Sequence, residues 1–274
     1  MRNEEGVMRN VDYFYRRMIL CEYSSRRMTI REFFDGLMTR SGIMRHRLWA
    51  CMVIIILHFS FLIPHLSAQT RSQWRDSVEV LNRELRQHPD DINLRLLKAE
   101  ANVNLEEWDY ALAEYGRILR ADERNLAALY FRAYVHERQK HYAQAKADYD
   151  AFLAIEPLHL EARLGLAHVL QKMGKKSDAT DELNHIVQMF PDSADAYAAR
   201  AAYETELQLW DVAVYDWDEA IRRRPQNEDY VISKVDVLLR LGRRSEAKEC
   251  LDKLVRQGTP RGSLKEWYDK CRIR

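Results

Sequence analysis

The chain has 274 residues, with 43 Lys and Arg against 42 Asp and Glu, so its formal net charge is +1. This balance excludes the strongly basic surface of a general nucleic-acid binder, and 47% hydrophobic residues indicate a folded chain. Only nine Gly and six Pro occur, which favours a mostly helical fold. Four Cys are too few for a disulfide-built scaffold.

The beginning of the chain differs in composition from the rest. Seven of the nine Met lie at or before position 52. Residues 48–63 are almost entirely apolar, follow two Arg, and precede Pro64 and a few small residues. This order is typical of a secretory signal peptide. We therefore predict a signal peptide over residues 44–69, cleaved after Ala68, and export of the remainder to the periplasm of a bacterial cell envelope.

Two questions about this segment stay open. The stretch from Leu48 to Thr70 carries no charge and is 23 residues long, so an uncleaved membrane anchor with the rest of the chain outside the cytoplasm is the alternative. Pro64 weakens that alternative, because it leaves a helix of only about 24 Å before it. We expect residues 1–43 to be either a prefix upstream of a true start at Met44 or a disordered extension.

Two cysteines, Cys250 and Cys271, follow the apolar segment. An oxidising compartment would permit a disulfide between them. Two separate buried thiols, which behave as small hydrophobic side chains, fit the sequence equally well.

A 34-residue period fills the chain after residue 70. Three series of small residues or prolines keep the same register, although the proline series skips one step. The series are Ala111, Ala145, Ala179, Ala213 and Ala247; Ala99, Ala133, Ala167, Ala201 and Val235; and Pro89, Pro157, Pro191 and Pro225.

Each period contains two helical patterns. Residues 126–140 and 142–155 both place apolar side chains at i, i+3, i+4 and i+7. The small series falls on both helices, where it lets the two helices of a hairpin approach closely. A proline then ends the pair.

These residues resemble the tetratricopeptide repeat family. The resemblance covers five units, preceded by a leading helix over 70–91 and followed by a capping helix over 262–274. It implies an all-α, right-handed superhelical solenoid of helix-turn-helix repeats, in which stacking supplies the core. The five units are 92–125, 126–159, 160–193, 194–227 and 228–261, together spanning 92–261.

The resemblance also implies a concave groove lined by the first helix of every unit, which binds a protein or peptide partner. Its floor is apolar and aromatic, with acidic residues around it, so a partner segment with apolar anchors and some basic residues fits best. Tyr130 and Tyr134 are the strongest contact candidates, unless they form part of the wall; the acidic residues alternatively form a solvated face. The candidate groove residues are Leu96, Glu100, Tyr130, Tyr134, Glu137, Leu164, His168, Asp195, Asp229, Ile232 and Asp236.

No catalytic motif is present: the sequence lacks a Gly-rich phosphate loop, Gly-x-Ser-x-Gly and His-Glu-x-x-His. His136 and His141 are five apart, which places them on different faces of a helix, so they predict no metal site. We therefore expect no enzyme activity, no cofactor and no metal, no nucleic-acid partner, and membrane contact only through the N-terminal segment.

Three functions remain in view. The first is an exported adaptor or assembly factor that binds another protein in its groove. The second is a glycan- or small-ligand-binding helical protein that uses groove aromatics for stacking. The third is a regulatory subunit of an envelope enzyme.

Overall fold

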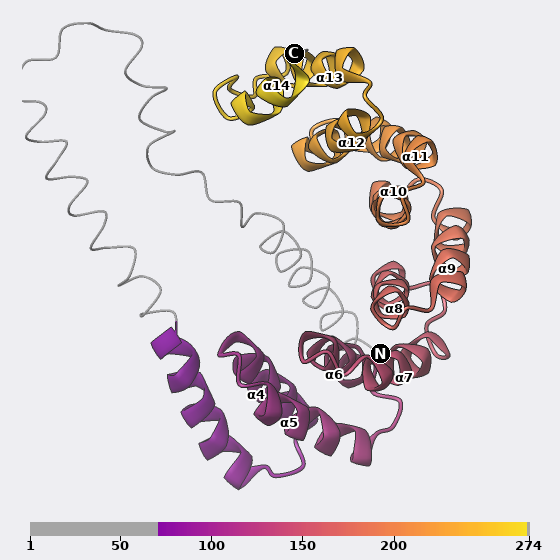
Figure 1. Ribbon diagram of the computed structural model, residues 1–274. Coiled ribbons are helices and arrows are strands. Elements are labelled where there is room, and N and C mark those ends of the chain that lie inside the picture. Colours follow the sequence, from indigo (N-terminus) through magenta and orange to yellow (C-terminus); the bar gives the residue numbers. More distant parts are fainter. Residues whose placement is uncertain (1–70, 273–274) are drawn as a thin grey trace, which may run out of the picture. The chain divides into compact units, whose positions relative to one another are not determined.

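The structure is a computed structural model that describes residues 71–272 (Figure 1). Helices joined by short turns make up this whole range, and no strand occurs within it. This confirms the all-α class and the repeated helix-pair fold. The predicted signal peptide over 44–69 and the extension over 1–43 lie outside the described residues.

A leading helix over 71–87 is followed by five helix pairs and a short final helix, α14 (Lys265–Cys271). The final helix is shorter than the predicted capping helix over 262–274, because residues 261–264 form a turn. The five pairs are α4 (Ile92–Asn104) with α5 (Trp108–Ala121), α6 (Leu126–Arg138) with α7 (Tyr142–Leu153), α8 (Leu160–Lys172) with α9 (Lys176–Met189), α10 (Ala194–Glu206) with α11 (Trp210–Arg223), and α12 (Glu228–Arg240) with α13 (Arg244–Arg256).

The first helix of every pair begins with a side-chain cap. In α6, for example, Asn125 accepts a hydrogen bond from the backbone N–H of Ala128, which satisfies a donor that the helix leaves free. None of the second helices α5, α7, α9, α11 and α13 has such a cap. The five capping residues are Asp91, Asn125, His159, Ser193 and Asn227.

The turn inside every pair contains one residue with positive φ, again at intervals of 34. Gly174 and Gly242 adopt it at 72° and 75°, where the missing Cβ removes the steric penalty. The other three turns use ordinary residues, Glu106, Lys140 and Gln208, at 61° to 62°. All five turns therefore share one backbone geometry, but only two of them have glycine, the residue that adopts it without strain.

The small residues of the repeat lie at the centre of each hairpin. Ala145 on α7 and Ala213 on α11 are 0% exposed, which confirms the packing role that the 34-residue spacing predicts. Large side chains complete the core one turn later on the same helices, and each contributes about 1.5–3 kcal/mol by burial. They are Tyr115, Tyr149, Leu183, Trp217 and Leu251.

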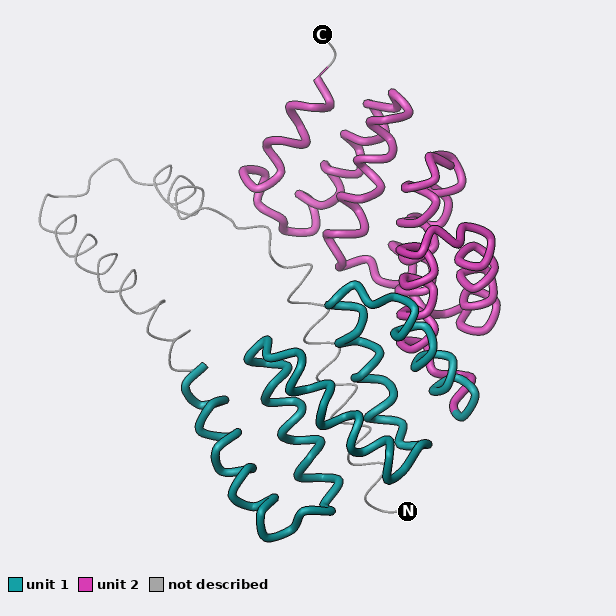
Figure 2. Tube along the Cα trace, turned by 60° about the horizontal axis from the view of Figure 1, so that its bottom comes forward, with its two compact units in different colours: residues 1–27, 34–155 teal, residues 28–33, 156–274 magenta. Residues whose placement is uncertain are grey.

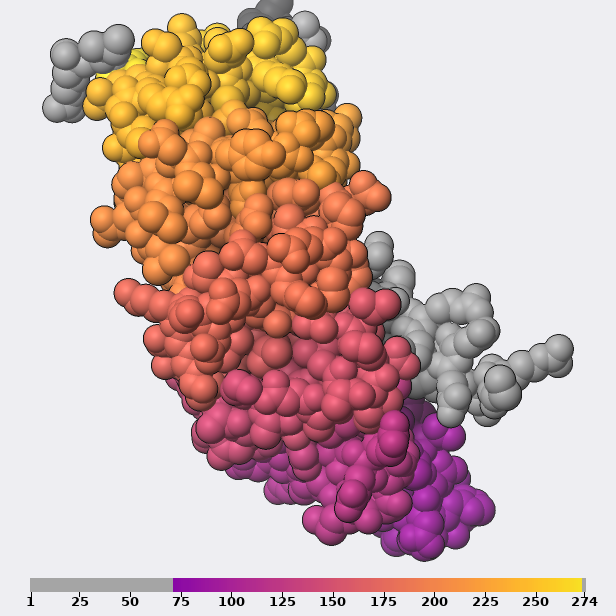
Figure 3. Space-filling view, turned by 90° about the vertical axis from the view of Figure 1, so that its right-hand side faces the viewer, coloured from indigo at the N-terminus to yellow at the C-terminus, as the bar shows by residue number. Residues whose placement is uncertain are grey.

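The described residues divide into two compact units, 71–155 and 156–272 (Figure 2). The first unit contains the leading helix and α4 to α7, and the second contains α8 to α14. From α4 onward, successive helices within each unit pack side by side in chain order, and their side chains form a continuous surface (Figure 3). In this part of the chain, no helix combines the length and the apolar character needed to cross a membrane.

Candidate functional site

In the first unit, the candidate groove residues lie on α4 and α6, two helices that contact each other. Leu96, Glu100, Tyr134 and Glu137 are half-buried, so each presents part of its side chain to solvent. We call these four residues the α4–α6 face. Glu137 also accepts a hydrogen bond of 3.3 Å from the hydroxyl of Tyr149, which ties it to the second helix of its own pair.

Tyr130 does not belong to this face. Its side chain is 1% exposed, and its ring packs against Phe131, Tyr149 and Phe152 at centroid distances of 5.4 to 6.1 Å. Tyr130 is therefore a core side chain of its own hairpin, which leaves almost no surface for the partner contact that the sequence predicted. The aromatic character of the segment misled the prediction, because a ring serves a core as well as it serves a binding surface.

Glu100 carries a carboxylate without a countercharge. No described residue donates a hydrogen bond to its side chain or forms an ion pair with it, and burial raises its pKa above the usual value. Its carboxylate also raises the pKa of the buried Tyr115 hydroxyl nearby. A half-buried carboxylate of this kind gains more from an added cation than a fully solvated one.

In the second unit, Asp195 is the most heavily engaged of the candidate groove residues. Arg224 donates two hydrogen bonds of 2.8 Å to its carboxylate, and the hydroxyl of Tyr230 donates a third of 2.6 Å. Arg224 follows α11 and Tyr230 lies on α12, so Asp195 joins two successive pairs. Asp195 is therefore a contact between successive pairs, and its side chain is still 46% exposed.

The other candidates in this unit remain partly accessible. Leu164, His168 and Ile232 are half-buried, and Asp229 is exposed. Asp236 pairs with Arg240 one turn later on α12 at 2.8 Å.

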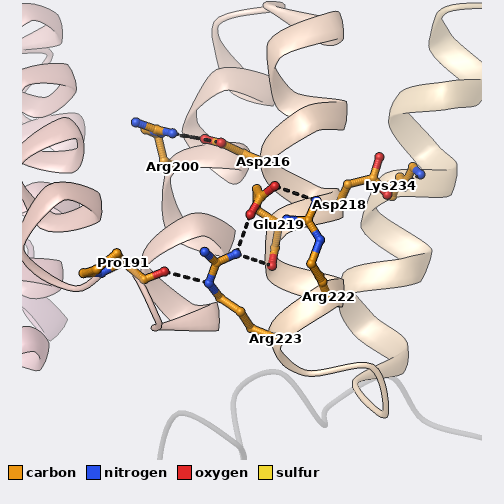
Figure 4. A network of polar contacts seen from close by, with 8 residues as sticks. All are labelled: Pro191, Arg200, Asp216, Asp218, Glu219, Arg222, Arg223 and Lys234. Carbon is orange, nitrogen blue, oxygen red and sulfur yellow. Dashed lines mark hydrogen bonds and ion pairs between the residues drawn. The ribbon is translucent and has the colours of Figure 1, made fainter.

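Each unit also contains ion pairs between the two helices of a hairpin, which the sequence interpretation missed. Arg132 donates two hydrogen bonds to Asp148, at 2.7 and 2.5 Å. Arg200 does the same to Asp216, at 2.5 and 2.9 Å (Figure 4). These two pairs lie 68 residues apart, and that doubled period is the signal that could have revealed them.

The pairs α4–α5 and α8–α9 use a different arrangement. Arg95 binds Glu114 at 2.9 Å and Arg163 binds Glu182 at 2.8 Å, again 68 residues apart. Each arginine also donates to the carbonyl of the proline before its helix, Pro89 or Pro157. Burial raises the pKa of Glu114, but Lys98, Arg95 and Arg117 together outweigh it and hold the pKa below the usual value.

One position beside these ion pairs is polar and incompletely satisfied in three of the five repeats. It holds Asn102 on α4, His136 on α6 and Glu204 on α10, and each has a buried side-chain atom without a hydrogen-bond partner. The equivalent residues on α8 and α12 are Leu170 and Leu238, both buried. We call this the interior position of the hairpin.

The basic run at residues 222–224 serves local structure. Arg222 and Arg223 both bind Glu219, at 2.7 and 2.6 Å, and Arg223 also donates to the carbonyl of Pro191 (Figure 4). Arg223 and then Arg222 hold the pKa of Glu219 below its usual value.

The two cysteines are free thiols in the structure. Cys271 on α14 is buried, and Cys250 packs against the same hydrophobic cluster, which also contains Leu251 and Leu254. Burial raises the pKa of both thiols. Cys271 is thus buried and Cys250 half-buried, and both side chains lie in or against one hydrophobic cluster.

The two histidines predicted to point apart are in fact neighbours. His141 lies in the turn before α7, and its ring centroid is 6.0 Å from that of His136. The prediction assumed one continuous helix and is corrected by the turn between them. Within residues 71–272, no cluster of three or more potential metal ligands occurs.

Comparison with known proteins agrees with this geometry. Residues 137–203 match the family described as tetratricopeptide repeat. The rice (Oryza sativa subsp. japonica) DnaJ protein P58IPK homolog A is 27% identical, over 51% of this chain and 40% of the rice protein. The chain therefore spans well under half of that relative.

Solved structures share the fold at low sequence identity. A tetratricopeptide repeat protein from Parabacteroides merdae ATCC 43184 superimposes with a TM-score of 0.56 at 19% identity, covering 74% of this chain and 79% of that one. MamA from Desulfovibrio magneticus RS-1 gives 0.54 at 19% identity, over 62% and 98%. YrrB, described as a TPR protein with an unusual peptide-binding site, gives 0.50 at 19% identity, over 69% and 98%. The 34-residue period, the helix pairs and the match over residues 137–203 together show that the described part of this chain has the fold of tetratricopeptide-type helix-pair repeats.

Proposed function

We propose that this chain is a non-enzymatic protein–protein interaction module that binds a segment of a partner protein along the first helices of its repeats, as an adaptor or assembly factor. Its family and fold support this role, and YrrB, which shares the fold, has a peptide-binding site. The fold alone does not identify a partner, so the kind of partner is inferred from the side chains of the α4–α6 face.

The observation that carries the proposal is the unpaired, half-buried carboxylate of Glu100. Leu97 lies three residues earlier on the same side of α4 and is 51% exposed. Tyr134 occupies the position equivalent to Glu100 on α6. An apolar side chain, a carboxylate and a ring on adjacent helices suit a partner segment that alternates apolar and basic residues.

The charge of the α4–α6 face supports the same partner. Its four residues include two acids, Glu100 and Glu137, and no Lys or Arg, although Lys and Arg slightly outnumber Asp and Glu in the whole chain. A basic segment is therefore attracted to this face and an acidic one is repelled.

Site-specific photo-crosslinking of the full-length protein in its own cells tests the proposal. A photoreactive residue at position 134 should capture a defined partner segment. The same residue at position 110 is the control, because Tyr110 is 67% exposed and lies on the second helix α5. Identical capture at both positions, or none at position 134, would exclude the α4–α6 face as the binding surface.

A synthetic peptide of the captured segment then measures the contribution of Glu100. Glu100→Gln should weaken binding about tenfold, since a charge-assisted hydrogen bond contributes about 1.5–3 kcal/mol. Glu123→Gln, at an exposed position between α5 and α6, should leave the affinity unchanged. Equal affinities for the wild type and Glu100→Gln would contradict the basic-partner proposal.

We also propose that the protein acts after export, because residues 44–69 have the pattern of a signal peptide. The mass of the N-terminal peptide of the mature protein tests this. A terminus at Gln69 supports export with cleavage, and an intact segment in the membrane fraction supports the anchored alternative. An intact segment in the cytoplasmic fraction would refute both.

A further inference from the structure

The interior of the α10–α11 hairpin places two carboxyl groups beside one guanidinium. Arg200 binds both oxygens of Asp216 and gives a third hydrogen bond, 3.0 Å long, to Asn184 on α9. Its Nε lies 3.9 Å from Glu204, beyond hydrogen-bonding distance. The side chain of Asp216 is 0% exposed and that of Glu204 is 12% exposed. The guanidinium of Arg200 therefore binds Asp216, and Glu204 lies beside it without a hydrogen bond from it.

The second oxygen of Glu204, Oε2, is buried and has no hydrogen-bond donor. Both carboxyl groups lie beside the same Nε of Arg200, Asp216 at 2.5 Å and Glu204 at 3.9 Å. Two ionised carboxylates cannot hydrogen-bond to each other, because neither carries a proton. If Glu204 holds one proton, it donates to Asp216, and the repulsion between two buried charges disappears.

We propose that Glu204 and Asp216 share one proton in the interior of repeat 194–227, and that loss of this proton loosens the α10–α11 hairpin. The electrostatics agree with the geometry. Burial and then the charge of Asp216 raise the pKa of Glu204 to about 7, with Arg200 acting in the opposite direction.

The surrounding helices add no second cation to this pair. On α10 itself the neighbouring charged group is Arg200, and Asn184 of α9, which accepts a hydrogen bond from Arg200, is neutral. On α11 the charged group that neighbours Glu204 is Asp216. From α8 and α12 no ionisable group shifts the pKa of Glu204, and Lys234 of α12 is bound to Asp218 at 2.6 Å.

The direction of the pH effect follows from the raised pKa. The ordinary value for a glutamate is 4.5, and in the fold it is about 7. A proton held more tightly in the folded state stabilises the hairpin fully below the ordinary value, and this stabilisation is lost as the pH rises through 7. The hairpin should therefore open more often at neutral pH than at pH 5.

The α6–α7 hairpin provides an internal reference with the opposite sign. His136 occupies the interior position there, beside Arg132 and Asp148. Burial lowers its pKa; Asp148 opposes this shift, while Arg132 and His141 reinforce it. A histidine held neutral stabilises its hairpin above its ordinary pKa, and that contribution is lost as the pH falls. The two hairpins should therefore respond to pH in opposite directions.

Hydrogen exchange of the full-length protein, read by mass spectrometry between pH 5 and 8 and corrected for intrinsic rates, tests the proposal. Protection of α10–α11 relative to α12–α13 should fall by up to about tenfold per pH unit until pH 7 and then level off. In Glu204→Gln the amide donates permanently to Asp216 and does not titrate, so the relative protection should be independent of pH. Glu206→Gln, at an exposed position on the same helix, should keep the wild-type slope.

An unchanged slope in Glu204→Gln, or no slope in the wild type, would overturn the proposal. A measurement on the wild type covers the case in which the variant folds poorly. The carboxyl carbon-13 resonance of Glu204 in the glutamate-labelled protein should titrate with a midpoint near 7. A midpoint below 5 would show that Glu204 is an ordinary ionised glutamate and would also refute the shared proton.

Discussion

The two compact units use the same ion-pair scheme around different apolar cores. Each begins with an arginine–glutamate pair and continues with an arginine–aspartate pair, and corresponding residues are 68 positions apart. The aromatic residues Tyr130 and Phe152 of the first unit correspond to Ala198 and Ala220 of the second. The ion pairs therefore tolerate a large change in the volume of the surrounding core.

The comparison also links side-chain length to helix register. Glutamate serves where the arginine lies 19 residues before the acid, and aspartate serves where the separation is 16. Three residues of helix amount to about 4.5 Å, so the arginine set further from the turn meets the longer acid. The arginine of a hairpin can thus lie at either of two positions, three residues apart, if the acid is glutamate for the farther position and aspartate for the nearer one.

The largest effect is expected from removing the arginine of an arginine–aspartate pair. Arg200→Met leaves Asp216 buried without a cation, which should lower the unfolding free energy of the second unit by about 3–5 kcal/mol. Arg132→Met should have a smaller effect on the first unit, because the Asp148 side chain is 7% exposed and that of Asp216 is 0% exposed. Denaturant-dependent hydrogen exchange, resolved for each unit, measures both.

Arg240→Met is the control for this pair of variants. Arg240 and its partner Asp236 are 55% and 38% exposed, so its loss should change stability by about 0.5 kcal/mol or less. Equal losses in all three variants would mean that burial does not decide the strength of these pairs.

An intermediate effect is expected from overpacking the hairpins. Ala145→Leu in the first unit and Ala213→Leu in the second should each lower stability by about 1–3 kcal/mol, because both alanines are 0% exposed between two helices. Ala143→Leu, at an exposed position on α7, should be close to neutral. Thermal melts check all three, and unchanged melting of the two buried variants would contradict the register described above.

The smallest effect concerns the turn inside each hairpin. Gln208→Gly should stabilise the second unit by about 0.5–1 kcal/mol, because a side chain at positive φ is strained by about 1–2 kcal/mol and glycine recovers most of that. Gly174→Ala should have the reverse effect at the equivalent turn, where φ is 72°. Chemical denaturation of both variants measures the difference, and a destabilised Gln208→Gly would show that the turn is unstrained.

The sequence was sufficient to predict the helices and their pairing. It was insufficient to predict which polar side chains bind each other. The spacing of Ala111, Ala145 and Ala213 located the hairpins, because a small residue is required wherever two helices touch. The partners of Asp195 could not be predicted in this way. Whether it faces solvent or Arg224 depends on how two successive repeats stack, and one repeat does not encode that.

Tyr130 shows the same limit for a core residue. Its position in the repeat was identified correctly, but the rings of Phe131, Tyr149 and Phe152 close over it. Glu100, at a neighbouring first helix, was placed on the same face and remains half-buried. Register predicts which side of a helix a residue occupies, and the volume of its neighbours decides whether it is accessible.

The short sequence separation of the ion-paired residues has a consequence for folding during synthesis. Arg132 and Arg200 meet their aspartates only 16 residues later in the chain. Contacts so close in sequence form quickly, because little chain entropy is lost in closing them. As the chain leaves the ribosome, each of these hairpins can neutralise its buried aspartate before the next repeat has emerged, so neither Asp148 nor Asp216 has to await a distant partner.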